Sequence, residues 1–368
     1  MNDLEIFREA ASALKTGGNI ALVTVISTTG STPGKVGYKM LASAKNSETM
    51  GTVGGGLTEA QIIKMAVSML SAPDSQVFRF DFGGTQEDEK GICGGSAEFL
   101  VETFDKRSLS LFEKLSTAIA SGEKGVLISI ISPRKPPEKI FLKDTDQIDA
   151  TTIIEFSQEV ITSIKGLAAK EQPAKILSGD GFEVFVETVA KQPPLIIFGA
   201  GHLSTHISRY AKSLNFTVTV CDDREQYANK ERFPDADHII VENFERAFDR
   251  IHIDSNSYIV IVARGHKYDE MILEQALMTN AKYIGMIGSK RKTLTILKRL
   301  NERGIPDQTL NRVYSPIGIS IGAVTPEEIA LSIVSELVKI RRIGDRPRTG
   351  HMTVSFSKML NKENEGNL

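Results

Sequence analysis

The stretch "LIIFGAGHLSTHISRYAKSLNFTVTVCDDR", residues 195–224, decides the fold of the second half of this chain. It begins with an apolar strand, continues through a glycine turn and a helix, and closes with a second strand that ends in acidic residues. Gly199, Gly201 and Ser204 form a variant of the dinucleotide-binding fingerprint, and the strand and helix that this fingerprint requires stand on either side of it. The stretch therefore predicts the first β-α-β unit of a Rossmann fold.

The residues that follow continue this pattern. The strand-like segments "DHIIV", "SYIVIVARGH" and "KYIGMIGSK" alternate with helical ones, which is typical of a doubly wound parallel sheet. The segment "TPEEIALSIVSELVKIRR" predicts a helix in which Thr325 and Glu328 form a capping box and Pro326 takes the first position. We expect a Rossmann-like domain over residues 191–343 and a polar tail over 344–368.

The first half, residues 1–190, mixes helix and strand signals and predicts an N-terminal α/β domain. Helical spacing appears near 57–70, 107–120 and 151–168, and β-branched or aromatic runs between these segments predict strands. "KQPP" at 191–194 separates this half from the Rossmann half, because consecutive prolines disfavour both a helix and a central strand. The strand order, and the topology of residues 105–190, does not follow from the pattern.

Candidate ligand-binding residues of the Rossmann half lie at the ends of its predicted strands. Asp222 and Asp223 end the second strand about 20 residues beyond the fingerprint, where an acidic side chain meets a ribose hydroxyl in nucleotide-binding relatives of the fold. Later strand ends contribute basic groups suited to a phosphate, and Lys290 and Arg291 are either part of that set or a solvated helix start. The candidates are Gly199, Gly201, His202, Ser204, Asp222, Asp223, Arg264 and His266.

The first half contains three consecutive glycines, Gly54, Gly55 and Gly56, between a strand-like run and a helix. Glycine permits positive φ and close approach of other groups, at a cost in ordering entropy. Two interpretations remain open: a tight turn that packs closely, or a cradle whose N–H groups face an anion at the helix N-terminus.

The chain has only two cysteines, Cys93 and Cys221, which excludes a disulfide framework. Cys93 lies in "GICGG", before Gly94 and Gly95, and is either an accessible thiol or a buried inert one. Cys221 lies in an apolar strand end and is expected to pack. No cysteine or histidine spacing typical of a metal site is present.

The composition narrows the functional class. The 44 Lys and Arg residues nearly balance the 46 Asp and Glu residues, which argues against a nucleic-acid or membrane-surface protein. The first residues lack an apolar signal-peptide core, and we expect a cytoplasmic protein. A length of 368 residues suits two domains.

The motifs together resemble the XdhC/CoxI family, accessory proteins of xanthine dehydrogenase and related molybdenum hydroxylases. The matching segments are "GSTPGKVGYKMLAS", "GTVGGGLTEA", "GICGG", "FGAGHLS", "VCDDR", "ARGHKYDE", "YIGMIGSKRK" and "SPIGISIGAVTPEEIALSIVSELV". The resemblance implies a protein that binds molybdenum cofactor (molybdopterin), supports its sulfuration with a cysteine desulfurase, and delivers it to an apo-hydroxylase. It also implies a chaperone rather than the dehydrogenase itself. We expect a homodimer, because two-fold dimers are the commonest assemblies of soluble proteins.

The resemblance also bears on individual residues. Some relatives have a cysteine where Leu57 stands here, so Cys93 is the remaining N-terminal thiol for contact with the molybdenum of the cofactor. The N-terminal cofactor-binding candidates are Gly54, Gly55, Gly56, Cys93, Gly94 and Gly95. The expected ligand position is a crevice between the two domains.

Two other functions remain open. One is an NAD(P)-dependent oxidoreductase, although no general acid–base pair stands beside the fingerprint and no catalytic residue is assigned. The other is an adaptor protein that senses a nucleotide.

Overall fold

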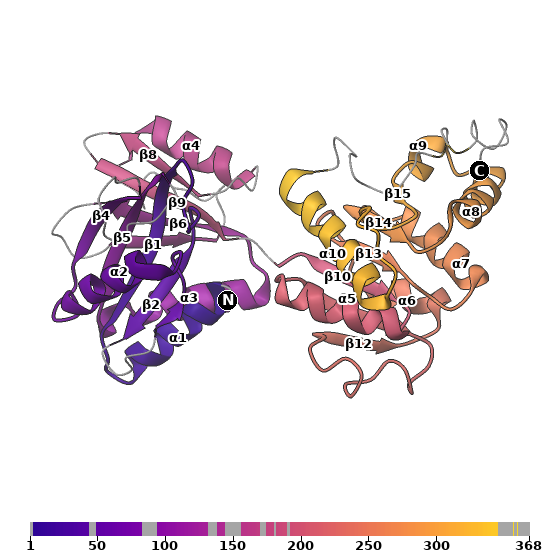
Figure 1. Cartoon of the computed structure of the whole chain (residues 1–368), viewed down its shortest axis with the longest axis horizontal. Coiled ribbons are helices and arrows are strands. Elements are labelled where there is room, and N and C mark those ends of the chain that lie inside the picture. The colour runs from indigo at the N-terminus through magenta and orange to yellow at the C-terminus, as the bar shows by residue number, and fades with distance from the viewer. Residues whose placement is uncertain are drawn as a thin grey trace. The chain divides into compact units, whose positions relative to one another are not determined.

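The computed structural model of the chain describes residues 3–43, 49–82, 94–131, 138–143, 156–169, 174–179, 182–189 and 192–344, together with Phe356 and Met359. Internal contacts divide the chain into two compact units, Met1–Lys191 and Gln192–Leu368 (Figure 1). The described strands form two sheets in the first unit and one in the second, and each unit has its own hydrophobic core clusters.

The second unit contains a six-stranded sheet in the order β12-β11-β10-β13-β14-β15. Every neighbouring pair of strands is parallel. The strands are β10 (Pro194–Phe198), β11 (Thr217–Asp222), β12 (His238–Val241), β13 (Tyr258–Ile261), β14 (Tyr283–Met286) and β15 (Val313–Tyr314). Numbered from the first strand of the unit, this order is 3-2-1-4-5-6, the order of a doubly wound dinucleotide-binding sheet. The predicted Rossmann-like fold is therefore confirmed.

Helices cover both faces of this sheet (Figure 1). The helices are α5 (His202–Ser213), α6 (Phe244–Arg250), α7 (His266–Leu277), α8 (Lys290–Glu302), α9 (Asp307–Leu310) and α10 (Pro326–Ile343). Buried residues of α5 and α10 pack on one face, and those of α6, α7 and α8 pack on the other. The predicted capping box of Thr325 and Glu328 is present at the start of α10, with Pro326 at its first position. Because the helix after β10 and the helix after β13 lie on opposite faces, a crevice is expected at the carboxyl ends of these two strands.

The first unit contains two antiparallel sheets, ordered β3-β2-β1-β5-β4 and β7-β6-β9-β8. The strands are β1 (Ile20–Thr29), β2 (Lys39–Ser43), β3 (Met50–Gly51), β4 (Ser75–Asp81), β5 (Ser96–Phe104), β6 (Gly125–Ile131), β7 (Glu138–Leu142), β8 (Lys175–Gly179) and β9 (Phe182–Val189). The pairing of β1 with β5 joins segments that are far apart in the sequence, which is why periodicity alone did not give the strand order.

Helices α1 (Asp3–Lys15), α2 (Gly56–Ser68), α3 (Leu109–Ser121) and α4 (Gln158–Ala169), with the short 3-10 helix η1 (Lys106–Ser108), complete the first unit. Buried residues of α2 pack on one face of the first sheet, and α1 and α3 pack on its other face. Helix α4 packs on the second sheet. The three predicted helices of this half therefore exist, although α4 begins at Gln158 rather than at 151.

Two ion pairs connect the two sheets of the first unit inside its core. Lys39 on β2 lies 2.5 Å from Glu187 on β9, and Lys139 on β7 lies 2.5 Å from Glu102 on β5. Burial raises the pKa of Glu102, although Lys139 opposes this shift. Burial lowers the pKa of Lys39, but Asp3 and Glu187 outweigh this effect and the net shift is upward. Because an unpaired charge inside a core is costly, removing one partner of either pair would destabilise the first unit.

Candidate functional site

The turn between β10 and α5 contains two glycines, Gly199 and Gly201, whose surroundings differ. Gly199 has a φ of 110°, and a Cβ there would lie 2.4 Å from the carbonyl oxygen of Val262, at the end of β13. A Cβ on Gly201 would meet no atom within 4 Å. Gly199 thus allows the turns after β10 and β13 to touch, while Gly201 leaves open space above the start of α5.

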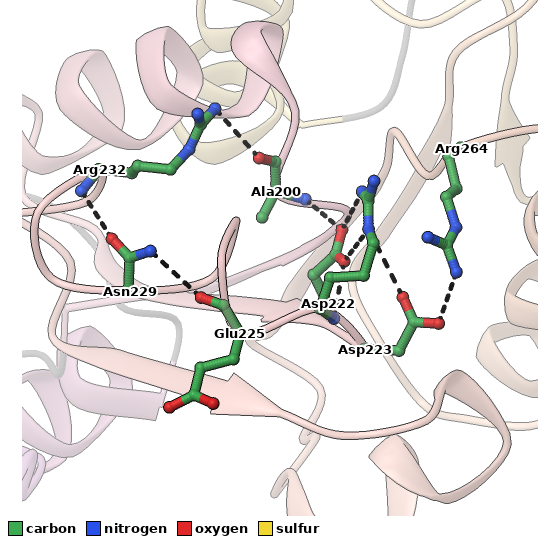
Figure 2. Close-up of polar contacts among 8 residues, drawn as sticks. Ala200, Asp222, Asp223, Glu225, Asn229, Arg232 and Arg264 are labelled. Carbon is green, nitrogen blue, oxygen red and sulfur yellow. Dashed lines mark hydrogen bonds and ion pairs between the residues drawn. The ribbon is translucent and has the colours of Figure 1, made fainter.

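Asp222, at the end of β11, is fully buried and bonded to the glycine turn. Its Oδ2 accepts a 2.8 Å hydrogen bond from the backbone N–H of Ala200, and Arg224 Nε donates to its Oδ1 over 2.9 Å (Figure 2). Burial raises the pKa of Asp222, but Arg224 and the Ala200 amide outweigh it, and the net shift is downward. Both carboxylate oxygens are therefore engaged inside the protein. The sequence prediction that Asp222 contacts a ribose stays a prediction.

Asp223 connects two strand ends that are not neighbours in the sheet. Its Oδ2 accepts a 2.7 Å hydrogen bond from Arg264, which follows β13, while Asp223 itself follows β11 (Figure 2). Strand β10 lies between β11 and β13. The Asp223–Arg264 ion pair therefore spans the carboxyl end of β10, where the glycine turn begins.

The loop from β11 to β12 adds two guanidinium groups that the sequence analysis missed. Arg224 and Arg232 stand over the ring of Tyr227, at 4.0 Å and 5.2 Å from its centroid. The Asn229 side chain accepts from the backbone N–H of Arg232 and donates to the carbonyl of Glu225, which shapes the loop (Figure 2). The "DDR" run signals Arg224, whereas Arg232 lies in irregular sequence and has no local signal.

The remaining Rossmann candidates lie in different environments. His202 is exposed at the start of α5, and Ser204 is fully buried with no hydrogen-bond partner for its hydroxyl among the described residues. His266 begins α7, and its side chain lies outside the described part of the structure. Lys290 and Arg291 are exposed at the start of α8. These contacts to a ligand stay predictions.

Cys221 is fully buried in the core of the second unit, as expected. Burial raises the pKa of its thiol to about 12, with Asp222 as the next contribution. Reactivity requires the thiolate, so Cys221 is inert at neutral pH.

In the first unit, the three glycines at the start of α2, Gly54 to Gly56, all have positive φ, and they differ in their surroundings. A Cβ on Gly54 would lie 2.7 Å from the backbone nitrogen of Gly34, whereas a Cβ on Gly55 or Gly56 would meet nothing within 4 Å. Glu59 on α2 accepts from Thr52 Oγ1 at 2.6 Å, from Val53 N at 2.8 Å and from Gly55 N at 3.1 Å.

These contacts lower the pKa of Glu59, outweighing the upward effect of its partial burial. The turn thus has features of both interpretations, the packed turn and the anion cradle. It packs closely at Gly54, and the amides of Val53 and Gly55 donate to an anion of the chain itself, the carboxylate of Glu59. An acidic residue in the first turn of a helix is the signal that points to Glu59. Binding of an external anion there stays a prediction.

The structure brings three glycine-containing loops of the first unit together. Gly94 and Gly95 lie against the loop after β1, where Ser31 and Gly94 form a β-bridge and a Cβ on Gly95 would lie 2.3 Å from the carbonyl oxygen of Thr29. The same loop contacts the turn before α2, because a Cβ on Gly34 would lie 2.2 Å from the carbonyl oxygen of Val53. We call these segments, residues 29–38, 52–56 and 94–95, the glycine cluster.

Cys93, predicted to contact molybdenum, lies outside the described residues, although Gly94 beside it belongs to the glycine cluster. Across the described part of the chain, no group of three or more His, Cys, Asp or Glu side chains is placed to hold a metal ion. The described helices include none that is both long and apolar enough to cross a membrane.

A sheet of this order with its glycine turn defines a Rossmann domain, joined in this chain to a β-rich unit with a glycine cluster. Two family profiles match these parts: the XdhC Rossmann domain at residues 195–337, and the XdhC and CoxI family at residues 13–81. The chain belongs to the XdhC and CoxI family.

Three curated relatives are similar to the chain. A protein from Bacillus subtilis, named as a probable subunit of xanthine dehydrogenase, is 25% identical over 87% of this chain and 93% of its own length. The molybdenum cofactor insertion chaperone PaoD of Escherichia coli is 20% identical over 91% of this chain and 88% of its own length. The uncharacterized protein YqeB of Escherichia coli is 29% identical over 44% of this chain, and the match spans only 30% of YqeB.

A solved structure supports the fold. A crystal structure described as a xanthine dehydrogenase from Bacillus halodurans matches 98% of this chain and 100% of its own length, with a TM-score of 0.77 and 24% identity. At this identity the likeness shows the fold alone.

Proposed function

We propose that this chain is an accessory protein that binds molybdenum cofactor as cargo and supports the maturation of a xanthine dehydrogenase-type molybdenum hydroxylase. The observation that carries this proposal is the end-to-end similarity to a relative named as a molybdenum cofactor insertion chaperone. The Bacillus subtilis relative, whose name connects it to xanthine dehydrogenase, has a similar length and covers most of the chain. The two relatives thus match most of this chain, and their names connect them to xanthine dehydrogenase and to molybdenum cofactor.

The glycine cluster is the part of the first unit that suits a flat, polar cargo. Gly55, Gly56 and Gly94 leave open space beside exposed or half-exposed backbone, so that a ligand can approach peptide groups closely. We propose that Cys93, next to Gly94, provides a soft sulfur ligand near the molybdenum. In this proposal the chain protects the cofactor while a cysteine desulfurase supplies sulfur, and then delivers it in the cytoplasm, with the chain acting as a homodimer.

The test is transfer of the cofactor to an apo-hydroxylase. The full chain is loaded with molybdenum cofactor, separated from free cofactor, and mixed with an apo molybdenum hydroxylase of the xanthine dehydrogenase type. The proposal expects hydroxylase activity to appear, with less activity when the Cys93→Ser variant is the donor and full activity with Cys221→Ala. A loaded chain that retains its cofactor and activates no such hydroxylase would contradict the proposal.

A second candidate function is nucleotide binding by the Rossmann crevice, for sensing or for oxidoreduction with NAD(P). The strand order of the second unit and the close contact of Gly199 with Val262 favour it. Hydride transfer needs a substrate and a proton donor or acceptor beside the nicotinamide, whereas sensing needs binding only. A thermal shift of the full chain with NAD(H) or NADP(H), followed by a search for redox turnover, separates these two uses.

A further inference from the structure

Five charged side chains surround the glycine turn of the second unit, and four of them neutralise one another. Asp222 pairs with Arg224 at 2.9 Å, and Asp223 pairs with Arg264 at 2.7 Å. Among the described residues, no carboxylate lies within ion-pair distance of the fifth group, Arg232. These five side chains together therefore carry one positive charge, which belongs to Arg232.

The structure leaves much of the hydrogen-bonding capacity of Arg232 unused. Its Nη2 is 3.5 Å from the carbonyl oxygen of Ala200, which is the outer limit of a hydrogen bond, and its Nε has no partner within the described part of the chain (Figure 2). A guanidinium has five N–H donors arranged to meet the oxygens of a phosphate. Tyr227 supports the guanidinium plane beside the turn.

The acidic group that would receive a ribose hydroxyl is already engaged. The Asp222 side chain is 1% exposed, and its oxygens accept from Ala200 and Arg224. In Rossmann folds an acidic residue at this strand end favours a free ribose 2′-hydroxyl, whereas a nearby arginine favours a 2′-phosphate. Here Asp222 is buried and neutralised by Arg224. Asp223 is paired with Arg264 through Oδ2, and its Oδ1 has no hydrogen bond among the described residues but lies 3.8 Å from Arg224. Arg232, without a counter-charge among the described residues, stands at the turn.

We propose that the Rossmann crevice prefers an adenine nucleotide with a phosphate on the ribose 2′-oxygen, as in NADP, and that Arg232 binds this phosphate. This inference rests on the second candidate function, that the crevice holds a nucleotide. It is independent of the cargo of the first unit. No catalytic step is assigned to Arg232.

Isothermal titration calorimetry of the full chain tests the inference with adenosine 2′,5′-bisphosphate and 5′-AMP, and again with NADP⁺ and NAD⁺. The phosphate-bearing member of each pair should bind at least about tenfold more tightly, the effect of one charge-assisted contact. Arg232→Gln should bring the ratio close to one, and Arg232→Lys should retain part of it.

Arg209→Gln is the matched control, because Arg209 is exposed on α5 and its loss removes one positive charge from the same unit. This variant should keep the full preference, and thermal unfolding without ligand should show every variant folded. Equal affinity for both members of each pair, or a preference that survives Arg232→Gln, overturns the inference and leaves nucleotide binding intact. If none of the four compounds binds, both the inference and the nucleotide candidate fail.

Discussion

The turn before α2 and the turn before α5 look alike in sequence, yet the carboxylate at each turn has different partners. Each joins a strand region to a helix through glycines, and in each a carboxylate of the chain accepts from turn amides. Glu59 has no basic side chain within ion-pair distance among the described residues, whereas Asp222 is paired with Arg224. The carboxylate of the first turn is thus without a paired cation among the described residues, whereas the second turn has both a paired carboxylate and Arg232 beside it.

The difference teaches that a glycine turn at a helix start does not by itself define an anion site. The amide groups and the helix dipole favour an anion at both turns, and the surrounding side chains decide whether the chain or a ligand supplies it. We therefore expect the phosphate of a ligand at the α5 turn and an uncharged or metal-bearing part of a ligand at the glycine cluster.

The largest expected effect on stability comes from replacing one of the two glycines of the α5 turn, Gly199, by alanine. Gly199→Ala places a Cβ 2.4 Å from a backbone oxygen at a φ of 110°. It should lower the free energy of unfolding by about 3 kcal/mol through strain and overpacking. Gly201→Ala should change it by less than about 1 kcal/mol, because the space above Gly201 is open. Urea unfolding of both variants measures the difference, and equal losses would contradict the division of tasks between the two glycines.

A larger side chain at Gly201 separates folding from binding. Gly201→Val should remain folded and lose affinity for adenosine 2′,5′-bisphosphate, because the phosphate can no longer approach the backbone of the turn. Unchanged affinity in a folded variant would show that the ligand does not use this turn.

Asp222→Asn should have the next largest effect. The Asp222 side chain is 1% exposed and holds both Ala200 and Arg224, so the exchange leaves the partly buried guanidinium with only the more distant carboxylate of Asp223, at 3.8 Å. We expect a loss of about 2–3 kcal/mol in the free energy of unfolding. Asp223→Asn should cost less than about 1 kcal/mol, because Arg264 is 40% exposed and its pair is screened by solvent. Comparable losses for both variants would argue that Asp222 is not buried as described.

Glu59→Gln should have a smaller effect that depends on pH. The amide keeps its size but loses the charge that faces Val53 and Gly55, and we expect a loss of about 1 kcal/mol at neutral pH. The pKa of Glu59 is lower in the folded protein than its ordinary value of 4.5. Its contribution is therefore present above that value and is lost as the pH falls through the folded pKa.

Unfolding curves of wild type and Glu59→Gln at several pH values measure this dependence. The two proteins should differ at neutral pH and converge as the pH falls below 4.5 and through the folded pKa of Glu59. A difference that stays constant across this range would mean that the charge of Glu59 does not stabilise the turn.

The second unit was predictable because its decisive contacts are local in sequence. The fingerprint, the strand–helix alternation and the Thr325 capping box are short patterns, and each appears where it was expected. The first unit depends on distant pairings such as β1 with β5, and the short strand β8 was missed altogether. Periodicity reports which face of a segment is apolar, but not which other segment covers it.

The candidate site at the α5 turn was likewise predictable only in the residues that belong to a short sequence pattern. The positions of Gly199, Gly201, Asp222 and Asp223 followed from the spacing of the fingerprint. Arg232 did not, because its place beside Ala200 depends on the loop that Asn229 shapes. The "DDR" run places Arg224 two residues from Asp222, but the spacing of the fingerprint does not indicate that the arginine neutralises this carboxylate.

The smallest expected effects concern the reactivity of the two cysteine thiols and the stability of their variants. Cys221 is fully buried, and its thiol has a pKa of about 12, so it should not react with a thiol reagent in the native protein. A reagent that releases a coloured group on reaction with a thiol should therefore label at most one cysteine per chain in the native wild-type protein. It should label none in Cys93→Ser. Labelling of Cys221 under native conditions would contradict its place in the core. Cys93→Ser should also leave the melting temperature nearly unchanged.

The most direct measurement of the central claim is the molybdenum and pterin that co-purify with the full chain from cells that make the cofactor. The account predicts both in near-equal amounts in wild-type protein, a sharp loss in Cys93→Ser, and no loss in the matched variant Cys221→Ala. A well-folded wild-type protein that carries neither molybdenum nor pterin, and takes up neither from added cofactor, would contradict the account.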